Sequence, residues 1–500
     1  MMAASTIQPG VALADLFDDC LPAELAGLRI SDIAADSRKV VAGSLFLACR
    51  GRSGHGLDHL SQALENGAAA VAWEPEDDAV TGGLALPVPA FAVSGLGQRL
   101  GQIADRFFGR PSEALAVIGI TGTNGKTTCA HLVAGALEAL GRPAGSIGTL
   151  GSGRFGALTP GTLTTPDAVE VHRKLARIRD CGGEFASMEV SSHALDQGRV
   201  SGVRFRLAAL TNLSREHLDY HVDMQRYGEA KARLFKAPGL TRAVINADDE
   251  FGRRLLENPP HGVSMFAVGR EVSAYGAQAL CIRSVNSSAN GLDVEFAFGD
   301  ALECLHSPLW GEFNAENLAV ALGLLLGLDV SLEAAVLALA TVSAPAGRME
   351  ALSKADSPVV LVDYAHTPDA LAKALTAARS HCPGNLFCVF GCGGERDPGK
   401  RPQMGSVAEK LADQVILTDD NPRAENGDRI LADIVAGMTS EPMRQRDRAA
   451  AIKTAIAAAG HGDVVLVAGK GHENYQLCAS GRRPFSDRQV VLDALESRHD

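Results

Sequence analysis

Residues 116–128, AVIGITGTNGKTT, decide the fold of the chain around them. The apolar run ending at Ile120 predicts a buried strand, and a helix is expected to begin near Lys126 after a glycine-rich turn. Such a turn binds phosphate, because the four backbone N–H groups of residues 122–125 can converge on an anion and the helix dipole attracts it. The pattern therefore predicts a P-loop, in which the lysine neutralises phosphate and a threonine hydroxyl ligates magnesium. The residues concerned are Gly122, Thr123, Asn124, Gly125, Lys126, Thr127 and Thr128.

The spacing of this loop departs from the common G-x-x-x-x-G-K-[ST] pattern, because Ile120 stands where the first glycine is usual. A tight strand-to-helix turn that binds no ligand is therefore the alternative interpretation. The strand, the glycines, the lysine and two threonines occur together, and this combination favours phosphate binding.

Alternating strand, turn and helix patterns continue from about Leu115 to the end of the chain and indicate the α/β class. The runs expected as buried parallel strands are AVIGI ending at Ile120, FASMEV ending at Val190, LAALTNL from Leu207, AVIN ending at Asn246, VVLVD ending at Asp363, LFCVF ending at Phe390, QVILTD ending at Asp419 and DVVLVAG ending at Gly469. The apolar run LAVALGLLLGL from Leu318 falls short of the roughly 20 residues that span a bilayer. We expect it to form a buried helix.

The chain has 500 residues, which is too long for one core at roughly 100 to 200 residues per domain. Pro345 and Gly347 interrupt an Ala/Leu-rich region and predict a boundary near residue 344. The first segment has strand signals of its own, SLFLAC and AAAVAW. We therefore expect three domains, at residues 1–96, 97–344 and 345–500.

The composition argues against several classes of partner. The formal net charge is −12 with no basic block, so neither nucleic acid nor an anionic membrane is an expected partner. The N-terminus has no basic region leading a hydrophobic segment, which argues against a signal peptide and favours the cytoplasm. The ten cysteines are scattered and are expected as free thiols. Small molecules are therefore the expected substrates. If they are anionic, the positive charge that binds them must be concentrated at the site, in specific Arg and Lys residues or a metal.

The stretch TGTNGKTT resembles the nucleotide loop of the Mur ligase family and of its relatives, the folylpolyglutamate synthetases. The family's further motifs follow in order over nearly the whole chain: MEVSSHALDQGR, TNLSREHLDYH, YGEAK, NADD, GEFNAEN, GRME, DYAHTPDAL, GCGGERDPGKRP, DNPR and AGKGHE. The resemblance implies a small N-terminal α/β domain that binds a nucleotide sugar, a central P-loop ATPase domain with a mainly parallel sheet, and a C-terminal Rossmann-like α/β domain. It implies an enzyme that joins a carboxylate to an amine through an acyl phosphate made from ATP, with Mg²⁺ as cofactor. As a default we expect a monomer.

The resemblance assigns catalytic roles to Lys126, Glu189, His217 and Lys231. Thr127, Glu189 and His217 match the family's magnesium ligands, although alone Glu189 reads equally as a surface carboxylate and His217 as a satisfied histidine. The family's lysine at the position of Lys231 is carbamylated, which turns a cation into an anionic ligand for a second Mg²⁺; otherwise Lys231 is a solvated lysine. The ATP-side residues implied are Asn314, Asn317, Arg348, Asp363 and His366. Asn314 and Asn317 also fit simple N-capping of a helix.

The resemblance also places the substrate UDP-MurNAc-L-Ala-D-Glu. In the first domain it points to Ser37, Arg52, Ser53 and Gly54, which ordinary turn chemistry explains nearly as well. In the central domain it points to Thr164, Thr165, Ser191, Gln197 and Arg199. The family's N-T-T is LTT here, with Leu163 in place of an amide. One hydrogen bond to the substrate is therefore in doubt.

The motif DNPR resembles that of members which add meso-diaminopimelate. This substrate carries a second ammonium and carboxylate, and Arg423 offers the carboxylate a bidentate partner, which L-lysine would leave uncompensated. The matching set is Arg396, Asp420, Asn421, Pro422, Arg423, Gly469 and Glu473. Asp-Asn-Pro is otherwise a plain turn sequence.

Two alternatives remain. The chain could be another amide ligase of the superfamily, adding lysine, D-Ala-D-Ala or glutamyl units to folate, and DNPR argues against all three. It could also be a catalytically silent protein that binds a nucleotide sugar and regulates something else. The presence of Lys126, Glu189, His217 and Lys231 argues against that role.

Overall fold

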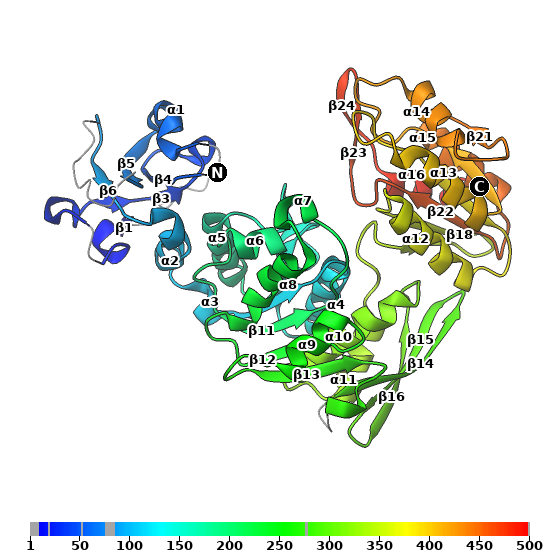
Figure 1. Ribbon diagram of the computed structural model, residues 1–500, viewed down its shortest axis with the longest axis horizontal. Helices are drawn as coiled ribbons and strands as arrows, with labels where there is room; N and C mark the ends of the chain where they lie inside the picture. Colours follow the sequence, from blue (N-terminus) through cyan, green and yellow to red (C-terminus); the bar gives the residue numbers. More distant parts are fainter. Residues whose placement is uncertain (1–9, 19–20, 52–53, 76–85, 276–278, 499–500) are drawn as a thin grey trace, which may run out of the picture.

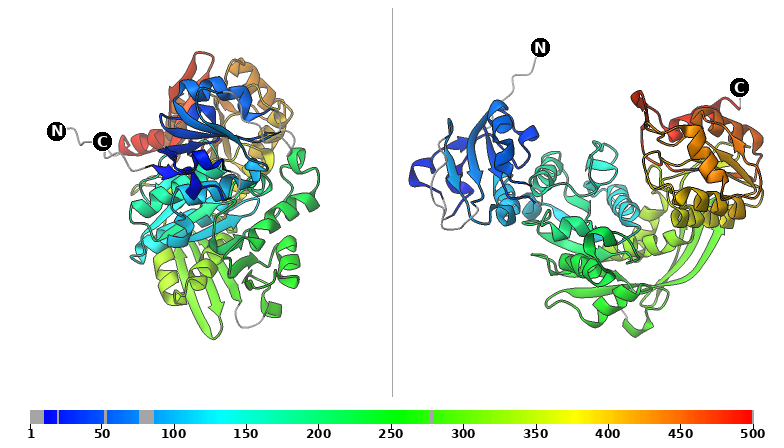
Figure 2. Two further views of the ribbon diagram at one scale, coloured as in Figure 1. Left: turned by 90° about the vertical axis from the view of Figure 1, so that its left-hand side faces the viewer. Right: turned by 45° about the horizontal axis from the view of Figure 1, so that its top comes forward.

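The computed structural model describes residues 10–18, 21–51, 54–75, 86–275 and 279–498. These residues form three α/β lobes that follow one another along the chain (Figure 1). The N-terminal and C-terminal lobes stand apart at the two ends of the central lobe, and the right-hand view in Figure 2 shows the same separation. The predicted fold class is confirmed.

The N-terminal lobe is built on a parallel sheet in the order β3-β4-β5-β6. Its elements are β1 (Val11–Ala12), β2 (Arg29–Ile30), β3 (Asp32–Ala34), β4 (Ser44–Ala48), β5 (Ala68–Trp73), β6 (Ala90–Ala92) and α1 (Leu60–Glu65), with the 3-10 helices η1 (Leu13–Asp15), η2 (Ala23–Leu25), η3 (Ser37–Lys39) and η4 (Gly56–His59). The two runs predicted as strands here, SLFLAC and AAAVAW, form β4 and β5.

The N-terminal lobe is held to the central lobe by ion pairs. Arg173 contacts Asp32 over 2.8 Å and donates to Ile33 O over 2.8 Å. Lys39 pairs with Asp167 over 2.9 Å. The linking helices are α2 (Leu96–Phe107) and α3 (Pro111–Ala114). Apolar packing adds to these ion pairs, because Val169 of the central lobe lies in one buried cluster with Phe91 and Leu96.

The central lobe contains one long sheet in the order β16-β15-β14-β13-β12-β11-β7-β10-β8-β9. Its strands are β7 (Ala116–Thr121), β8 (Ala144–Gly148), β9 (Gly151–Arg154), β10 (Phe185–Glu189), β11 (Phe205–Leu210), β12 (Arg242–Asn246), β13 (Ser264–Gly269), β14 (Leu280–Ser288), β15 (Gly291–Phe298) and β16 (Ala301–Ser307). The strands from β8 to β14 along this order pair in parallel, and β9, β15 and β16 are antiparallel.

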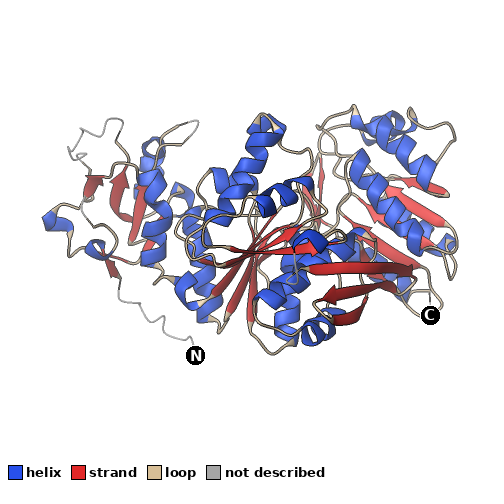
Figure 3. Ribbon diagram, turned by 60° about the horizontal axis from the view of Figure 1, so that its bottom comes forward, coloured by secondary structure: helices blue, strands red, loops and turns tan. Residues whose placement is uncertain are grey.

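Helices cover both faces of the central sheet (Figure 3). They are α4 (Lys126–Ala139), α5 (Ala168–Asp180), α6 (Ser192–Asp196), α7 (Leu218–His221), α8 (Met224–Ala232), η5 (Arg233–Lys236), α9 (Glu250–Glu257), η6 (Ser273–Tyr275), α10 (Phe313–Gly327) and α11 (Leu332–Ala340). The apolar run from Leu318 lies in α10, where Leu318, Leu322 and Leu325 are fully buried. The buried helix expected there is confirmed. Among the residues that the structure describes, no helix combines the length and the apolar character needed to cross a bilayer.

The C-terminal lobe has a sheet in the order β17-β18-β22-β19-β20-β21, parallel except for β17. Its elements are β17 (Glu350–Leu352), β18 (Val359–Asp363), α12 (Pro368–His381), β19 (Leu386–Phe390), α13 (Lys400–Leu411), β20 (Gln414–Leu417), α14 (Gly427–Val435), β21 (Met443–Arg444), α15 (Arg448–Ala458), β22 (Val464–Ala468), the hairpin β23 (Tyr475–Cys478) and β24 (Gly481–Pro484), and α16 (Asp487–Glu496).

The predicted strands are present, and their ends differ slightly from expectation. The run QVILTD ends as a strand at Leu417 rather than Asp419, because Asp419 turns to form an ion pair with Arg446. The run beginning at Leu207 starts two residues earlier, at Phe205, and ends at Leu210. The described cysteines are free thiols, as expected.

Parallel strands place their carboxyl ends at one edge of each sheet, and this decides where the predicted site residues gather. Glu189 pairs with Ile120, and Leu210 pairs with Thr121. In the C-terminal lobe, Asp363 pairs with Ala468. The motifs that follow these strands therefore meet at one edge of their sheet.

Candidate functional site

The P-loop lies between β7 and α4, where it was predicted, and packs against the loop after β11. Gly122 and Gly125 adopt positive φ values of 151° and 83°. A Cβ at Gly122 would lie 1.8 Å from Thr211 Oγ1, and one at Gly125 would lie 2.2 Å from Asn317 Oδ1. Only glycine fits these two positions.

Asn212 engages two of the N–H groups that were expected to face a phosphate. Thr123 N–H donates to Asn212 O, and Asn124 N–H donates to Asn212 Oδ1, each over 2.9 Å. The expectation of four converging loop N–H groups therefore does not hold for these two. The first turn of α4, which carries Thr127 and Thr128, lacks intrahelical acceptors for its N–H groups and keeps donors available to a phosphate.

The Lys126 side chain folds back over the loop. Its Nζ donates to Gly122 O over 2.9 Å and to Thr123 O over 2.6 Å. Burial lowers the pKa of Lys126, while the carboxylates of Glu189 and Glu216 raise it. A bound phosphate could replace the two neutral carbonyls as the acceptor for this ammonium, and a hydrogen bond to an anion is stronger.

Glu189 is 2% exposed and lies beside the first turn of α4. Its Oε2 accepts from Thr127 Oγ1 over 2.8 Å, and its Oε1 accepts from Thr149 N over 2.7 Å. A Cβ at Gly148 would lie 2.2 Å from Glu189 Oε1, so the carboxylate fills a space that glycine leaves. The predicted pair of Thr127 and Glu189 is thus in direct contact.

His217 lies on the loop after β11, in the left-handed region with φ 57°, and its side chain is 44% exposed beside Glu216. Its ring packs edge-on against His193 and Tyr227. Among the described residues, no three histidine, cysteine or carboxylate side chains converge on one point. Thr127 and Glu189 nevertheless offer hard oxygen donors, and Mg²⁺ takes few protein ligands and fills its octahedron with water and phosphate oxygens. The residues present fit such an ion.

Lys231 is 1% exposed on α8, not solvated. Its Nζ donates to Gly122 O over 2.6 Å and lies 4.5 Å from the centre of the Tyr227 ring. Burial lowers its pKa far below the ordinary value, and the charge of Lys126 lowers it further. The solvated-lysine interpretation is excluded.

Asn314 and Asn317 form a buried chain of hydrogen bonds against the P-loop. Asn317 Nδ2 donates to Asn314 Oδ1 over 2.7 Å, and Asn314 Nδ2 donates to Trp310 O over 2.7 Å. The N-cap of α10 is Glu312, with no side-chain cap. The N-capping alternative is therefore excluded, and Asn317 lies beside Gly125.

Arg348, Asp363 and His366 lie where the central and C-terminal lobes join. The Arg348 guanidinium stacks 5.0 Å from the Tyr364 ring, and its charge contributes to lowering the pKa of Lys126. Both oxygens of Asp363 accept backbone N–H groups, from Met349 and Ala365, over 2.8 Å. Asp363 therefore shapes the linker that carries Arg348. His366 is exposed, with Nδ1 2.8 Å from Tyr364 O.

The first-domain residues show turn chemistry. Ser37 is 5% exposed and donates to Gln62 Oε1 over 2.7 Å. Gly54 O accepts from Gly51 N over 2.8 Å. Arg52 and Ser53 lie outside the described residues. The structure does not bring this set together with the central one.

The central-domain set is one connected network. Thr165 Oγ1 donates to Glu189 O over 2.9 Å, and Arg199 Nη1 donates to Thr165 O over 3.0 Å. Gln197 accepts from Arg199 and donates to Tyr220 OH. The remaining members are Thr164, which contacts Thr149 Oγ1 over 3.0 Å, and Ser191, which caps α6. Leu163 next to them is 51% exposed.

The C-terminal set meets at the carboxyl edge of β20 and β22. Asn421 Nδ2 donates to Glu473 Oε2 over 3.0 Å, and the fully buried Lys470 donates to both side chains. Asp420 is buried, which raises its pKa. A Cβ at Gly469 would lie 2.6 Å from Asp420 Oδ2. Acidic and amide oxygens thus gather on one side of the site.

Arg396 and Arg423 lie on the loops after β19 and β20. A Cβ at Gly393 would lie 3.1 Å from Arg423 Nη1 and 3.6 Å from Arg396 Cγ, so the two side chains flank Gly393. Arg423 donates to Gly394 O over 2.7 Å. A Cβ at Gly394 would lie 2.0 Å from Pro422 O. The absence of a side chain at Gly394 therefore lets the two loops pack closely.

Sequence reasoning missed several residues that the structure brings into the site. They are Asn212 beside the P-loop, Thr149 on Glu189, Tyr227 over Lys231, and Lys470 between Asn421 and Glu473. Asn212, Tyr227 and Lys470 stand inside motifs already singled out, and their contacts in the folded chain were the missing signal.

Comparisons with known proteins find relatives that match nearly the whole chain. Three family descriptions match: "Mur ligase family, catalytic domain" at residues 29–108, "Mur ligase middle domain" at residues 120–325 and "Mur ligase, glutamate ligase domain" at residues 347–471. A UDP-N-acetylmuramoyl-L-alanyl-D-glutamate–2,6-diaminopimelate ligase from Xanthomonas campestris pv. campestris (strain 8004) is 47% identical, over 99% of this chain and 98% of its own. The chain belongs to the Mur ligase family. A Chromobacterium violaceum protein of the same name is 48% identical over 94% of this Mur ligase and 95% of its own length.

Solved structures resemble this Mur ligase as well. A structure of a UDP-N-acetylmuramoyl-L-alanyl-D-glutamate–2,6-diaminopimelate ligase superposes with a TM-score of 0.73 at 34% identity, over 98% of this chain and 100% of that one. A MurF ligase from Thermotoga maritima in complex with ADP gives a TM-score of 0.63 at 20% identity, over 93% and 97% of the two chains. At that identity the second match shows the shared fold alone.

Proposed function

We infer that this protein is an ATP-dependent amide ligase that adds meso-diaminopimelate to the D-Glu γ-carboxylate of UDP-MurNAc-L-Ala-D-Glu. The products are ADP, phosphate and UDP-MurNAc-tripeptide, a precursor of peptidoglycan. Relatives about as long as this chain carry this activity in their names at 47% identity. The reaction belongs in the cytoplasm, where ATP and the nucleotide precursor are found, and we propose that the protein acts there as a monomer.

The observation that carries the choice of amino acid is the pairing of Arg396 and Arg423 around Gly393. Arg423 lies two residues after Asn421, whose side chain donates to Glu473, so cationic and acidic groups belong to the same edge of the sheet. An amino acid with a distal carboxylate and a distal ammonium matches both sides. L-Lysine would leave the guanidinium groups without an anion.

The first step transfers the γ-phosphoryl group of ATP to the substrate carboxylate. Such a step depends mainly on positioning and on neutralisation of charge. The Lys126 ammonium would leave Gly122 O and Thr123 O to bind the phosphates, and Asn317 would fix the loop through its contact with Gly125. Thr127, Glu189 and His217 would hold Mg²⁺, which when bound supplies electrophilic stabilisation of the phosphoryl oxygens.

We further propose that Lys231 is carbamylated. Burial lowers the pKa of the Lys231 amine well below its ordinary value and so favours loss of its proton, and the neutral amine is a nucleophile for CO₂. The N–C bond forms as the amine lone pair attacks the carbon, one proton leaves, and the product is an anionic carbamate. This anion would relieve the contact between two cations at Gly122 O and would offer oxygen ligands to a second Mg²⁺.

In the second step, the amine of the amino acid attacks the acyl phosphate. The amino-acid site lies on the C-terminal lobe and the P-loop on the central lobe, so the lobes must close. The linker through Arg348 and Met349, which Asp363 shapes, is the proposed hinge. We propose domain limits of 1–96, 97–344 and 345–500 for these moving parts.

The deciding experiment measures phosphate release and product mass with ATP, Mg²⁺ and UDP-MurNAc-L-Ala-D-Glu. Parallel reactions receive meso-diaminopimelate, L-lysine or no amino acid. We expect turnover and a tripeptide product with meso-diaminopimelate alone. Preference for lysine would refute the specificity, and absence of turnover with either amino acid would refute the ligase function.

A further inference from the structure

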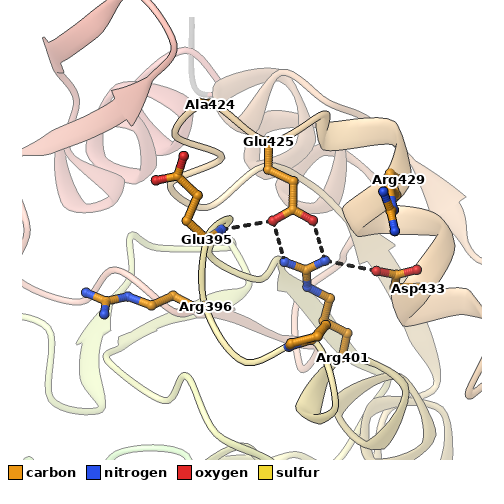
Figure 4. Close-up of a pocket in the computed structure, with 8 residues that line it drawn as sticks. Glu395, Arg396, Arg401, Ala424, Glu425, Arg429 and Asp433 are labelled. Carbon is orange, nitrogen blue, oxygen red and sulfur yellow. Dashed lines mark hydrogen bonds and ion pairs between the residues drawn. The ribbon is translucent and has the colours of Figure 1, made fainter.

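A cavity of about 370 Å³ opens on the C-terminal lobe beside the proposed amino-acid site (Figure 4). Arg396 lines one side of it, and Arg401 and Glu425 face each other in its wall. Arg396 is one of the two guanidinium groups assigned to the substrate. The contacts of Arg401 and Glu425 therefore bear on how that group is held.

Arg401 is a buried cation at the start of α13. It is 1% exposed, and it donates to Glu425 Oε1 over 2.7 Å and to Glu425 Oε2 over 2.8 Å. A third bond runs to Asp433 Oδ2 over 2.9 Å. The bidentate contact with Arg401 lowers the pKa of Glu425 to about 2. The pair is therefore ionised throughout the physiological range.

Glu425 also ties together the two loops that carry the substrate-binding arginines. It follows Arg423 by two residues, and its Oε2 accepts from Glu395 N, the residue before Arg396, over 2.9 Å. Arg401 Nη2 reaches Gly393 O over 3.4 Å. One ion pair thus fixes the loop of Arg396 against the loop of Arg423.

Both loops hold a residue in an unfavourable backbone conformation at this junction. Glu395 has φ 53° and Arg423 has φ 54°, in the left-handed region. This backbone conformation is unfavourable for a residue with a Cβ and persists only where the surroundings fix it. The Arg401–Glu425 pair supplies such fixing contacts for the loop of Glu395.

We propose that Arg401 and Glu425 are positioning residues for the amino-acid site. They hold Arg396 and Arg423 at the separation that a distal carboxylate requires, and their side chains bond to no residue assigned to ATP or the nucleotide sugar. The proposal rests on the function proposed above. Removal of groups that orient the ligands of metal sites typically changes affinity or activity by about 10- to 100-fold, and we expect an effect of that size here.

The test compares Glu425→Ala and Glu425→Gln with the unaltered protein in the ligase assay. The KM for meso-diaminopimelate should rise by roughly 10- to 100-fold in Glu425→Ala. It should rise less in Glu425→Gln, whose amide oxygen still accepts from Glu395 N. The KM values for ATP and for UDP-MurNAc-L-Ala-D-Glu should stay within about twofold, because the side chains of this pair bond to no residue assigned to either substrate.

Glu441→Gln is the matched control. It also removes one carboxylate from an Arg–Glu pair of the same lobe, with Arg444, but it touches neither loop. It should leave all three KM values unchanged. If Glu425→Ala does not fold, as judged by thermal unfolding, Glu425→Gln alone decides the question.

Unchanged KM for meso-diaminopimelate in a folded Glu425 variant overturns the proposal. Parallel loss of kcat and of affinity for all three substrates also overturns it, because that pattern indicates a merely structural pair. Failure of the proposed function looks different, since the unaltered protein itself would then show no turnover with meso-diaminopimelate.

Discussion

Lys126 and Lys231 donate to one shared acceptor, the main-chain oxygen of Gly122, over 2.9 and 2.6 Å. Burial lowers the pKa of both amines. Two cations at one carbonyl repel each other, and the deeper one gains most from losing its charge. This contact links the P-loop to Lys231, the residue proposed to carry the carbamate. Lys231 should therefore lower the stability of the protein while it is needed for activity.

Replacement of Lys231 by methionine should stabilise the protein while it abolishes activity. A lysine whose pKa is lowered by folding costs stability at every pH below its ordinary value of about 10.4, and an apolar side chain of similar length removes that cost. In bicarbonate-free buffer we expect a higher Tm by calorimetry, and in buffer that contains bicarbonate we expect a tripeptide yield lower by at least about 100-fold. Lys236→Met, at an exposed position, is the control. Near-normal activity of Lys231→Met would refute the carbamate proposal.

Replacement of Arg423 should weaken binding of the amino acid selectively. Loss of a bidentate partner for a carboxylate costs roughly 1.5 to 3 kcal/mol, so the KM for meso-diaminopimelate should rise by about 10- to 100-fold in Arg423→Ala. Arg423→Lys should recover only part of this, because an ammonium cannot reproduce the planar fork. Steady-state kinetics with each substrate varied provide the measurement, with the exposed Arg444→Lys as control. An unchanged KM in Arg423→Ala would remove this residue from the site.

Leu163→Asn should tighten binding of the nucleotide substrate. Leu163 is 51% exposed next to Thr164, so an amide there meets no steric barrier and restores a hydrogen-bonding group. A gain of about 1 kcal/mol corresponds to a roughly fivefold lower KM for UDP-MurNAc-L-Ala-D-Glu. Leu163→Ala serves as control, since it removes the apolar side chain without adding the amide. If both variants behave alike, the departure from the family pattern has no bearing on this substrate.

Val222→Gly should stabilise the protein. Val222 follows α7 with φ 73° and ψ −53°, a conformation that is strongly disfavoured for a β-branched residue, and its side chain is 65% exposed. Relief of strain of roughly 1 to 3 kcal/mol exceeds the roughly 0.5 to 1 kcal/mol entropic cost of glycine, and little packing is lost. Thermal unfolding should show a higher Tm. Val222→Ala, which keeps a Cβ, should gain less, and a lower Tm in the glycine variant would contradict the reasoning.

His381 should make the join between the central and C-terminal lobes sensitive to acid. Gly311 N donates to its Nε2 over 2.8 Å, which requires the neutral ring, and Nδ1 then donates to Ser288 O over 2.6 Å. Burial lowers the pKa of His381, although Ser288 O and Glu312 raise it. Since folding lowers this pKa, the stability it confers is present above the ordinary value near 6.5 and is lost as pH falls below it.

Calorimetry at a series of pH values from roughly 5 to 8 tests this sign. His381→Asn keeps a donor and an acceptor but does not titrate. The unaltered protein should lose more stability than His381→Asn as the pH falls, while the other histidines contribute equally to both. Identical pH profiles would show that His381 does not titrate in this range.

The elements were predictable where the chain's own periodicity dictates them. Strands β7, β10 and β18 and the helix from Lys126 follow from short apolar runs and a glycine-rich turn. The antiparallel meander of β14, β15 and β16 was not predicted, because its strands alternate polar and apolar residues and resemble loops along the sequence. Single residues also misled: Thr123 and Asn124 were expected to face phosphate, and their N–H groups bind Asn212 instead.

The sequence by itself determined the fold class, the P-loop, the family and the residue types available to the site, because these follow from periodicity and from spacing within short segments. Only the tertiary structure decided which groups meet. It placed Lys231 on Gly122 O, Asn317 over Gly125, and Glu425 between the loops of Arg396 and Arg423. The physical reason is that parallel strands far apart in the chain end at one edge of a sheet, and burial there sets charges and contacts that spacing along the chain does not contain.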